Sequence, residues 1–389
     1  MSKLTRRIAC LLLLSLLLVH LTPTASAKEA HPIRTDATAA VLIEAESGDV
    51  IWAQNAQQSL PMASTTKIMT ALVALETASP EQMICVDPAA VGAEGSSVYL
   101  AAGEELTLEQ LLYALLLESA NDAALAIAIG LCGSVEAFAD RMNQRATEMG
   151  LQNTHFVNPH GLDDKAHYTT AHELALITRE ALKNPTLARI VSTRRASIPH
   201  ADDPEGRLLI NHNKLLRSYP DCIGVKTGYT TRSGRCLVSA AARDGVTLIA
   251  VTLNASSDWQ THADMLDYGF SRYHAVLLAD ADCYRTTLPI VGGTRDGILL
   301  SNVDALSVTL PKGHGSIRST VEAPHFLYAP TVAGETVGTA RFYCDTDGDG
   351  QEELIGSLPL IACETVAQAK PEKRGLAALW QWICEWFKK

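Results

Sequence analysis

The chain has 389 residues, of which 47% are hydrophobic and 19% charged, and its formal net charge at pH 7 is −11. This length supports more than one domain with a sizeable core, and the acidic balance argues against nucleic acid as a partner. The nine cysteines lie at wide intervals without zinc-site spacing. No zinc site is therefore predicted from the cysteines, and no other metal and no cofactor is expected.

A secretory signal peptide is predicted for residues 1–27. Three basic residues precede an apolar stretch over residues 8–19, and Ala25-Ser26-Ala27 forms a small-residue cleavage site. The stretch is short for a membrane span. The sequence thus predicts an exported protein whose mature chain begins at Lys28.

The first string with catalytic chemistry is Ser64-Thr65-Thr66-Lys67, which follows a hairpin predicted for residues 39–53. If residues 64–76 form a helix, Lys67 lies one turn from Ser64 and can take its hydroxyl proton. An apolar stripe would bury this helix, and burial near Lys226 would disfavour the ammonium form of Lys67. Taken alone, Ser-x-x-Lys is more often a polar helix start with a solvated lysine.

The second string is Ser119-Ala120-Asn121. A capping box at Thr107 opens a predicted helix whose apolar pattern stops at Glu118. The loop that follows would present Ser119 and Asn121. Alternatively, this string is the polar cap of a next helix over residues 122–129.

The third string, Lys226-Thr227-Gly228, ends an alternating run over residues 223–227 that is typical of a strand. Gly228 would let another backbone or a ligand approach closely; the alternative is an edge strand with an exposed lysine. Residues 236–253 would complete the sheet, and residues 264–273 form a closing helix. Two further capped helices are predicted, over residues 134–150 and from Thr170.

The remaining chain is of a different type. Residues 277–366 show short alternating runs between turns, which predicts a small all-β domain. Its acidic string over residues 345–350 begins like a calcium loop, but the twelfth position is Gly356 where a bidentate glutamate is required. The string is therefore interpreted as an acidic hairpin turn.

The last residues predict an interfacial amphipathic helix within residues 367–389. One face carries apolar and aromatic side chains and basic residues stand at both ends, a pattern typical of a membrane-surface anchor. The alternative is a helix that docks on its own domain. The apolar face consists of Leu376, Leu379, Trp380, Ile383 and Phe387.

In this order, the three strings resemble the signature set of the penicillin-recognising serine D,D-peptidases and serine β-lactamases. Over nearly the whole mature chain, the surrounding sequence is similar to D-alanyl-D-alanine carboxypeptidases, and among them to the type-5 low-molecular-mass penicillin-binding proteins. The similar segments are residues 61–70, 118–123, 153–156, 160–163 and 224–230.

The resemblance implies an α/β (α+β) architecture. Residues 28–276 would form a β-lactamase/transpeptidase-like catalytic domain with a mainly antiparallel sheet flanked by helices. The all-β domain of residues 277–366 and the anchoring helix of residues 367–389 would follow. The enzyme would sit on the outer face of the cytoplasmic membrane, facing the cell wall and peripherally anchored.

The resemblance also implies the reaction. Ser64 would attack the carbonyl between the two terminal D-alanines of a peptidoglycan stem peptide, and Lys67 would take its proton. Ser119 would relay that proton to the leaving nitrogen, while Asn121 would hydrogen-bond Lys67 and the substrate amide. Water would then hydrolyse the acyl-enzyme. β-Lactams would acylate the same serine, but their adducts would leave slowly.

The resemblance implies that the third string, Lys226-Thr227-Gly228, binds the substrate. Lys226 and Thr227 would hold the terminal carboxylate, and the N–H groups of Ser64 and Tyr229 would form the oxyanion hole. The stretch Asn211-His212-Asn213 aligns with one in which relatives often place an arginine that helps hold the substrate carboxylate. This histidine can donate a hydrogen bond but is largely neutral at pH 7; the alternative is a polar loop histidine.

Other functions use the same residues. A serine β-lactamase needs an efficient deacylation base, and the Glu-x-x-Asn string that supplies it in class A enzymes occurs here only from Glu118 to Asn121, over the second motif itself. A D,D-endopeptidase with the same site stays open. The intact strings argue against a non-catalytic wall-binding protein, and the lack of His-Glu-x-x-His argues against a metallopeptidase.

Overall fold

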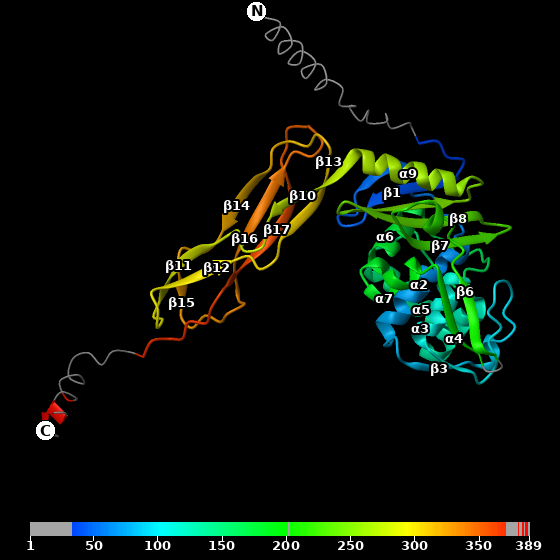
Figure 1. Cartoon of the computed structure of the whole chain (residues 1–389), viewed down its shortest axis with the longest axis horizontal. Helices are drawn as coiled ribbons and strands as arrows, with labels where there is room; N and C mark the ends of the chain where they lie inside the picture. The colour runs from blue at the N-terminus through cyan, green and yellow to red at the C-terminus, as the bar shows by residue number, and fades with distance from the viewer. Residues whose placement is uncertain (1–32, 201–202, 371–379, 381–382, 385, 388–389) are drawn as a thin grey trace, which may run out of the picture. The chain divides into compact units, whose positions relative to one another are not determined.

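The structure is a computed structural model that describes residues 33–200, 203–370, 380, 383–384 and 386–387 (Figure 1). The chain divides into two compact units. The first runs to Ala242 and resumes over Thr247–Ser271, and the second comprises Arg243–Val246 and the chain from Arg272 onward. The predicted signal peptide lies outside the described residues.

A five-stranded sheet forms the centre of the first unit, in the order β2-β1-β9-β8-β7. β1 runs antiparallel to β2 and β9, and β7 runs antiparallel to β8, which confirms the predicted hairpin and antiparallel sheet. β7 lies at the edge, so one of its sides is open to a ligand. The strands are β1 (Ala39–Glu44), β2 (Val50–Gln54), β7 (Cys222–Thr230), β8 (Gly234–Arg243) and β9 (Val246–Leu253).

Helices cover both faces of this sheet (Figure 1). Val41 and Ile43 of β1 join the large core of the helical side. The alternate residue Leu42 faces α9, where a Cβ added at Gly269 would lie 3.1 Å from its side chain. The helices are α2 (Lys67–Thr77), α3 (Leu108–Leu117), α4 (Asn121–Cys132), α5 (Val135–Glu148), α6 (Ala171–Leu182), α7 (Pro185–Ser192), α8 (Leu215–Ser218) and α9 (Asp258–Arg272).

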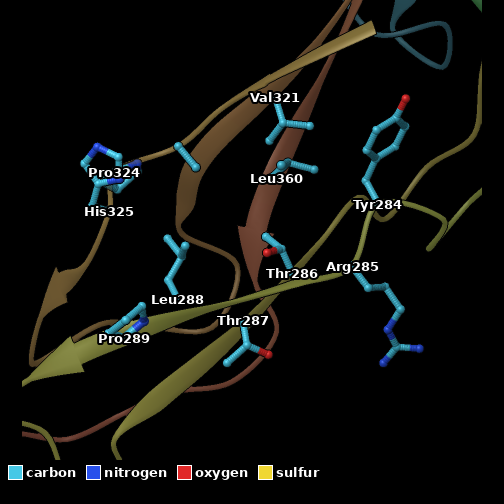
Figure 2. Close-up of a pocket in the computed structure, with 11 residues that line it drawn as sticks. Tyr284, Arg285, Thr286, Thr287, Leu288, Pro289, Val321, Pro324, His325 and Leu360 are labelled. Atoms are coloured by element: carbon cyan, nitrogen blue, oxygen red, sulfur yellow. The ribbon is translucent and has the colours of Figure 1, made fainter.

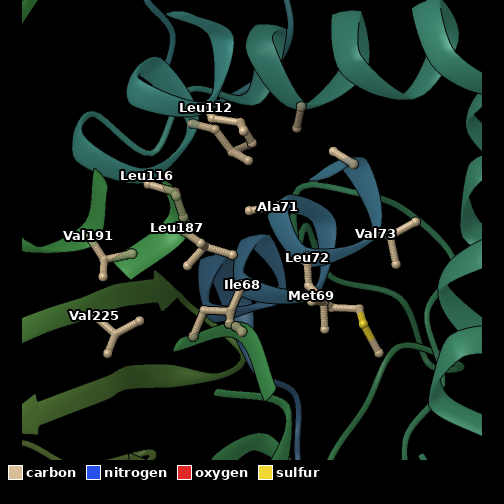
Figure 3. Packing of buried hydrophobic residues seen from close by; sticks show 14 of the residues in the cluster. Ile68, Met69, Ala71, Leu72, Val73, Leu112, Leu116, Leu187, Val191 and Val225 are labelled. Atoms are coloured by element: carbon tan, nitrogen blue, oxygen red, sulfur yellow. The ribbon is translucent and has the colours of Figure 1, made fainter. Parts of the chain in front are cut away.

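The centre of the helical core is α2. Its predicted apolar stripe is buried, with Ile68 and Ala71 fully enclosed between helices and sheet (Figure 3). Leu75 is only partly buried. The shorter elements of the first unit are η1 (Ala63–Thr66), β3 (Met83–Cys85), η2 (Pro88–Ala90), β4 (Glu105–Thr107), β5 (Arg195–His200) and β6 (Asp203–Ile210).

The helix starts follow the predicted caps with one exception. Thr107 and Gln110 exchange both hydrogen bonds of a capping box, at 3.2 and 2.8 Å. At Thr170 the hydroxyl accepts from the Glu173 N–H at 3.0 Å, but the Glu173 carboxylate does not complete the box. It accepts instead from the chain before α6, including the Asn153 N–H at 3.0 Å. The predicted box at Thr170 is therefore half wrong.

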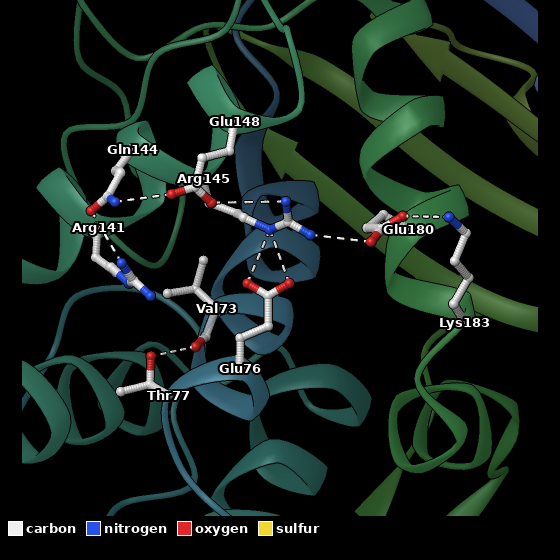
Figure 4. A network of polar contacts seen from close by, with 9 residues as sticks. All are labelled: Val73, Glu76, Thr77, Arg141, Gln144, Arg145, Glu148, Glu180 and Lys183. Carbon is white, nitrogen blue, oxygen red and sulfur yellow. Dashed lines mark hydrogen bonds and ion pairs between the residues drawn. The ribbon is translucent and has the colours of Figure 1, made fainter. Parts of the chain in front are cut away.

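A polar network ties three helices together on the surface of the first unit (Figure 4). Arg145 of α5 donates to Glu76 of α2 at 2.9 Å and to Glu180 of α6 at 3.1 Å. Lys183 also contacts Glu180, at 2.6 Å. One guanidinium thus links carboxylates of both α2 and α6 to α5.

The second unit is all β, as predicted. β10 (Tyr273–Ala279) pairs with β13 (Leu306–Pro311), and a six-stranded sheet has the order β14-β16-β17-β12-β11-β15. Its acidic string is the turn between β16 and β17, which confirms the interpretation as a hairpin turn. The sheet strands are β11 (Thr286–Val291), β12 (Gly297–Ser301), β14 (Arg318–Glu322), β15 (Leu327–Tyr328), β16 (Thr336–Cys344) and β17 (Glu353–Ala362).

A cavity of about 520 Å³ opens on this unit between β11 and the end of β14. Leu288 and Val321 contribute apolar side chains to its lining, and Tyr284, Arg285 and His325 contribute larger polar ones (Figure 2). None of these residues is part of a predicted site.

Among the described residues, no single helix is long and apolar enough to cross a membrane, although α4 and α5 pass that test jointly as a pair bent by 85°. The predicted anchoring helix of residues 367–389 lies partly outside the described residues. Trp380, Trp386 and Phe387 are described, and their side chains are exposed by 65 to 76%. The anchor stays a prediction.

Candidate active site

The serine and lysine of the first string lie side by side. Ser64 belongs to the 3₁₀ turn η1 and Lys67 begins α2, so the predicted α-helix starts three residues late. The 3₁₀ turn preserves the contact because its period is three residues. The fully buried Lys67 amine lies 3.0 Å from Ser64 Oγ, and its other contacts are 2.7 Å to Asn121 Oδ1 and 2.6 Å to the His160 carbonyl.

Two buried lysines set the electrostatics of the site. Burial lowers the pKa of Lys67 well below its ordinary value, the positive charge of Lys226 lowers it further, and Asp122 opposes both. Burial also lowers the pKa of Lys226, to about 7. A neutral Lys67 amine, able to accept the hydroxyl proton of Ser64, is therefore accessible near neutral pH.

The second string, Ser119-Ala120-Asn121, is positioned by contacts with the loop of residues 94–100. Ser119 has a left-handed backbone, with φ of 61°, and Asn121 is the first residue of α4; the string is thus both a loop and a helix start. Asn121 Nδ2 donates to the Glu94 carbonyl at 2.6 Å. This contact turns the amide oxygen toward Lys67. The buried Asp122 carboxylate fixes the facing loop by accepting from the Leu100 N–H at 3.0 Å.

The third string brings the edge strand β7 against the nucleophile. Lys226 is buried, which excludes the alternative of an exposed lysine, and its amine donates to the Thr227 carbonyl at 2.8 Å. A Cβ added at Gly228 would lie 3.0 Å from the Ser64 nitrogen. Glycine is thus what allows the strand to approach the serine so closely.

A loop that carried no predicted role completes the site. It places the His160 carbonyl against the Lys67 amine, and Gly161 against η1, where an added Cβ would lie 1.9 Å from the Ala63 oxygen. Thr70 of α2 donates to the Pro159 carbonyl at 2.6 Å. Two signals in the sequence mark this loop: the family-like segment of residues 160–163, and the turn-forming Asn158, whose side chain accepts from the Gly161 N–H at 2.7 Å.

These elements enclose a cavity of about 350 Å³. His212 also lines it, and its Nε2 contacts the Glu118 carboxylate at 3.1 Å. Lys67, Asn121 and Lys226 lie behind the wall of the cavity. Predicted residues on the lining are Ser64, Ser119, Thr227, Gly228, Tyr229 and His212; unpredicted ones are Ser96, Lys214, Arg235, Cys236, Asp258 and Trp259.

Among the described residues, one cluster of side chains has the spacing of a cation site, Asp345, Asp347 and Asp349 on the acidic turn of the second unit. The site in the first unit consists instead of a serine on the cavity wall with two buried lysines and an amide behind it. This donor set fits acyl transfer to a serine better than metal chemistry.

The fold and this side-chain arrangement define an acyl-serine hydrolase of the penicillin-binding class. The model of the D-alanyl-D-alanine carboxypeptidase family, Peptidase S11, matches residues 25–257. The chain belongs to this family and is a serine-type D-Ala-D-Ala carboxypeptidase.

Relatives match along most of the chain. The D-alanyl-D-alanine carboxypeptidase DacF of Bacillus subtilis is 31% identical over 94% of this chain and 95% of its own length. DacC of Escherichia coli is 30% identical over 94% of each. Penicillin-binding protein 5 of Haemophilus influenzae has a similar structure, with a TM-score of 0.67, 25% identity and coverage of 87% of this chain and 99% of the other.

Proposed function

We propose that Ser64 is the nucleophile with which this carboxypeptidase removes the terminal D-alanine of a peptidoglycan stem pentapeptide. The observation that carries the proposal is the 3.0 Å contact between Ser64 Oγ and a buried lysine whose pKa is lowered by burial and by a second lysine. A serine without such a base is a poor nucleophile at neutral pH.

Acylation begins when Ser64 Oγ attacks the carbonyl carbon between the two D-alanines and its proton passes to the neutral Lys67 amine. The N–H groups of Ser64 and Tyr229 stabilise the oxyanion. Support comes from the position of Ser64 in the first turn of a helix, where N–H groups lack intrahelical partners.

Collapse of the tetrahedral intermediate breaks the carbon–nitrogen bond. Ser119 passes the proton from Lys67 to the leaving nitrogen, and D-alanine departs as a free amino acid. Water then attacks the ester on Ser64 and gives up a proton to Lys67, which returns it to the serine oxygen. Support for Ser119 is its place on the cavity beside Ser64.

The same serine accepts β-lactams, in keeping with the penicillin-binding fold. A β-lactamase would need a further carboxylate to activate water during deacylation. Glu118, the glutamate of the Glu-x-x-Asn string, is already engaged: its carboxylate accepts from the Ile210 N–H at 2.5 Å and contacts His212 at 3.1 Å. We therefore prefer the carboxypeptidase, with slow release of penicillin.

The enzyme acts outside the cytoplasm on the cell wall. We propose further that a signal peptide of residues 1–27 exports it and that a helix within residues 367–389 anchors it to the outer face of the cytoplasmic membrane. The exposed aromatic side chains of Trp380, Trp386 and Phe387 support the anchor. The proposed extents of the catalytic domain, residues 28–276, and of the β domain, residues 277–366, follow the sequence.

Two reactions of the purified mature chain test the active site. A fluorescent penicillin should label the wild type stably, and a D-Ala-D-Ala-terminated peptide should release D-alanine. Ser64→Ala should abolish both while the thermal unfolding midpoint stays near that of the wild type; Ser192→Ala, at an exposed serine, is the control. Labelling that persists in Ser64→Ala refutes the assignment, and rapid penicillin turnover by the wild type favours the β-lactamase.

The anchor is tested separately. A chain that ends before Arg374 should move from the membrane fraction to the soluble fraction and keep its D-alanine release. Continued membrane association of the shortened chain would contradict the anchor without affecting the assignment of Ser64.

A further inference from the structure

Two cations without a predicted role line the cavity that contains Ser64. Arg235 of β8 and Lys214 just before α8 both lie over the Trp259 ring, at 5.7 and 5.9 Å from its centroid. We propose that Arg235 binds the C-terminal carboxylate of the substrate and so makes the enzyme specific for peptides with a free C terminus. This inference rests on the proposed function.

The guanidinium of Arg235 is held in one orientation. Its Nε and Nη2 donate to the two oxygens of Asp258, at 3.0 and 2.8 Å. Asp258 is almost fully buried, whereas 43% of the Arg235 side chain is exposed. Two of the five N–H donors are thus committed, and the described residues give the side chain no further hydrogen bond. The remaining donors are free for a ligand in the cavity.

The pairing of β7 with β8 places the Arg235 guanidinium beside the third string, Lys226-Thr227-Gly228. Arg235 is paired with Tyr229 across β7 and β8, and residues directly opposite share one face of a sheet. Thr227 lies two residues before Tyr229 and therefore on the same face. Because Thr227 and Arg235 also line one cavity, a carboxylate bound at the Thr227 hydroxyl lies within the range of the guanidinium fork, which matches carboxylate geometry.

The other cations of the site are less suited to this task. The Nε2 of His212 already contacts Glu118. Lys226 is buried, donates to its own strand, and has a pKa lowered by burial to about 7, so its charge is not permanent. Lys214 is exposed, and among the described residues its amine has no hydrogen bond or ion pair that would fix it. Arg235 alone combines permanent charge with fixed orientation.

A pair of substrates separates recognition from a structural role. One acyl-D-Ala-D-Ala peptide has a free carboxylate, and the other is the same peptide with a C-terminal carboxamide. We expect Arg235→Ala to lower the ratio of kcat/KM for carboxylate over carboxamide at least about tenfold, since a hydrogen bond to a charged group is worth about that much. The carboxamide reaction itself should be unchanged. Arg232→Ala, at an exposed arginine in the turn just before β8, is the matched control.

Arg235→Lys covers the case in which the alanine variant fails to fold because Asp258 loses its partner. It keeps the charge but not the fork, and should also lower the ratio. An unchanged ratio in the folded variants, or a loss that is equal for both substrates, overturns the role of Arg235, as does a ratio that falls in Lys214→Ala instead. If the wild type cleaves neither peptide, releasing neither D-alanine from the carboxylate nor D-alaninamide from the carboxamide, the proposed function falls as well.

Discussion

The contact between Asn121 and Lys67 provides a direct test of the lysine as the base. Asn121→Asp replaces the neutral oxygen, 2.7 Å from the amine, with an anion in a buried site. Two unit charges about 4 Å apart attract by about 4 kcal/mol at an effective dielectric constant of 20. The ammonium form of Lys67 is stabilised by this amount, and acylation on the ascending limb of the pH profile should fall by up to about a thousandfold.

The assay is the second-order rate of labelling by a fluorescent penicillin, measured across pH. Because Lys67 must be neutral to accept a proton, the rate rises as pH rises through its lowered pKa, and the aspartate variant should shift this limb to higher pH. Asn121→Ala is the control that removes the oxygen without adding charge, and it should lower the rate without an upward shift. A uniform loss at every pH in Asn121→Asp would refute the assignment of Lys67.

Three further predictions follow from neighbouring contacts. Burial lowers the pKa of Lys226 to about 7, so the free enzyme loses the positive charge of this amine above that pH. We therefore expect kcat/KM for D-alanine release to decline above pH 7. Lys226→Arg, which keeps its charge, should remove the decline. Gly161→Ala should unfold at lower urea than Gly92→Ala, since both positions have positive φ but only Gly161 lacks space for a Cβ. Thr107→Ala should lower the free energy of unfolding, measured in urea, by about 1 kcal/mol through loss of the helix cap.

The sequence predicted features whose chemistry is local. The Ser64–Lys67 contact depends on a spacing of three residues, and this contact survives the change from α-helix to 3₁₀ turn. The capping box at Thr107 likewise needs only residues within one turn. Such predictions succeed because neither depends on how distant segments meet.

Features that depend on distant segments were missed. The Glu173 carboxylate does not make the predicted capping-box hydrogen bond, because the loop before α6 offers it other N–H donors. The capping pattern contains no information about that loop. Arg235 and Asp258 form their ion pair only because the start of α9 packs beside the start of β8. From sequence, α9 was expected to begin at residue 264, so Asp258 had no assigned element at all.

The two buried lysines depend both on local sequence and on how distant segments pack. Each string carries its own lysine, but the lowered pKa of Lys67 depends on burial and on the charge of Lys226, which reaches it only through the fold. The repulsion is mutual in principle, so the two amines titrate as a coupled pair rather than as independent groups. The strings therefore identify the lysine that acts as base, whereas the fraction of neutral amine at neutral pH is a property of the packed site. A change that exposes Lys67 to water should raise its pKa and lower that fraction without altering any of the three strings.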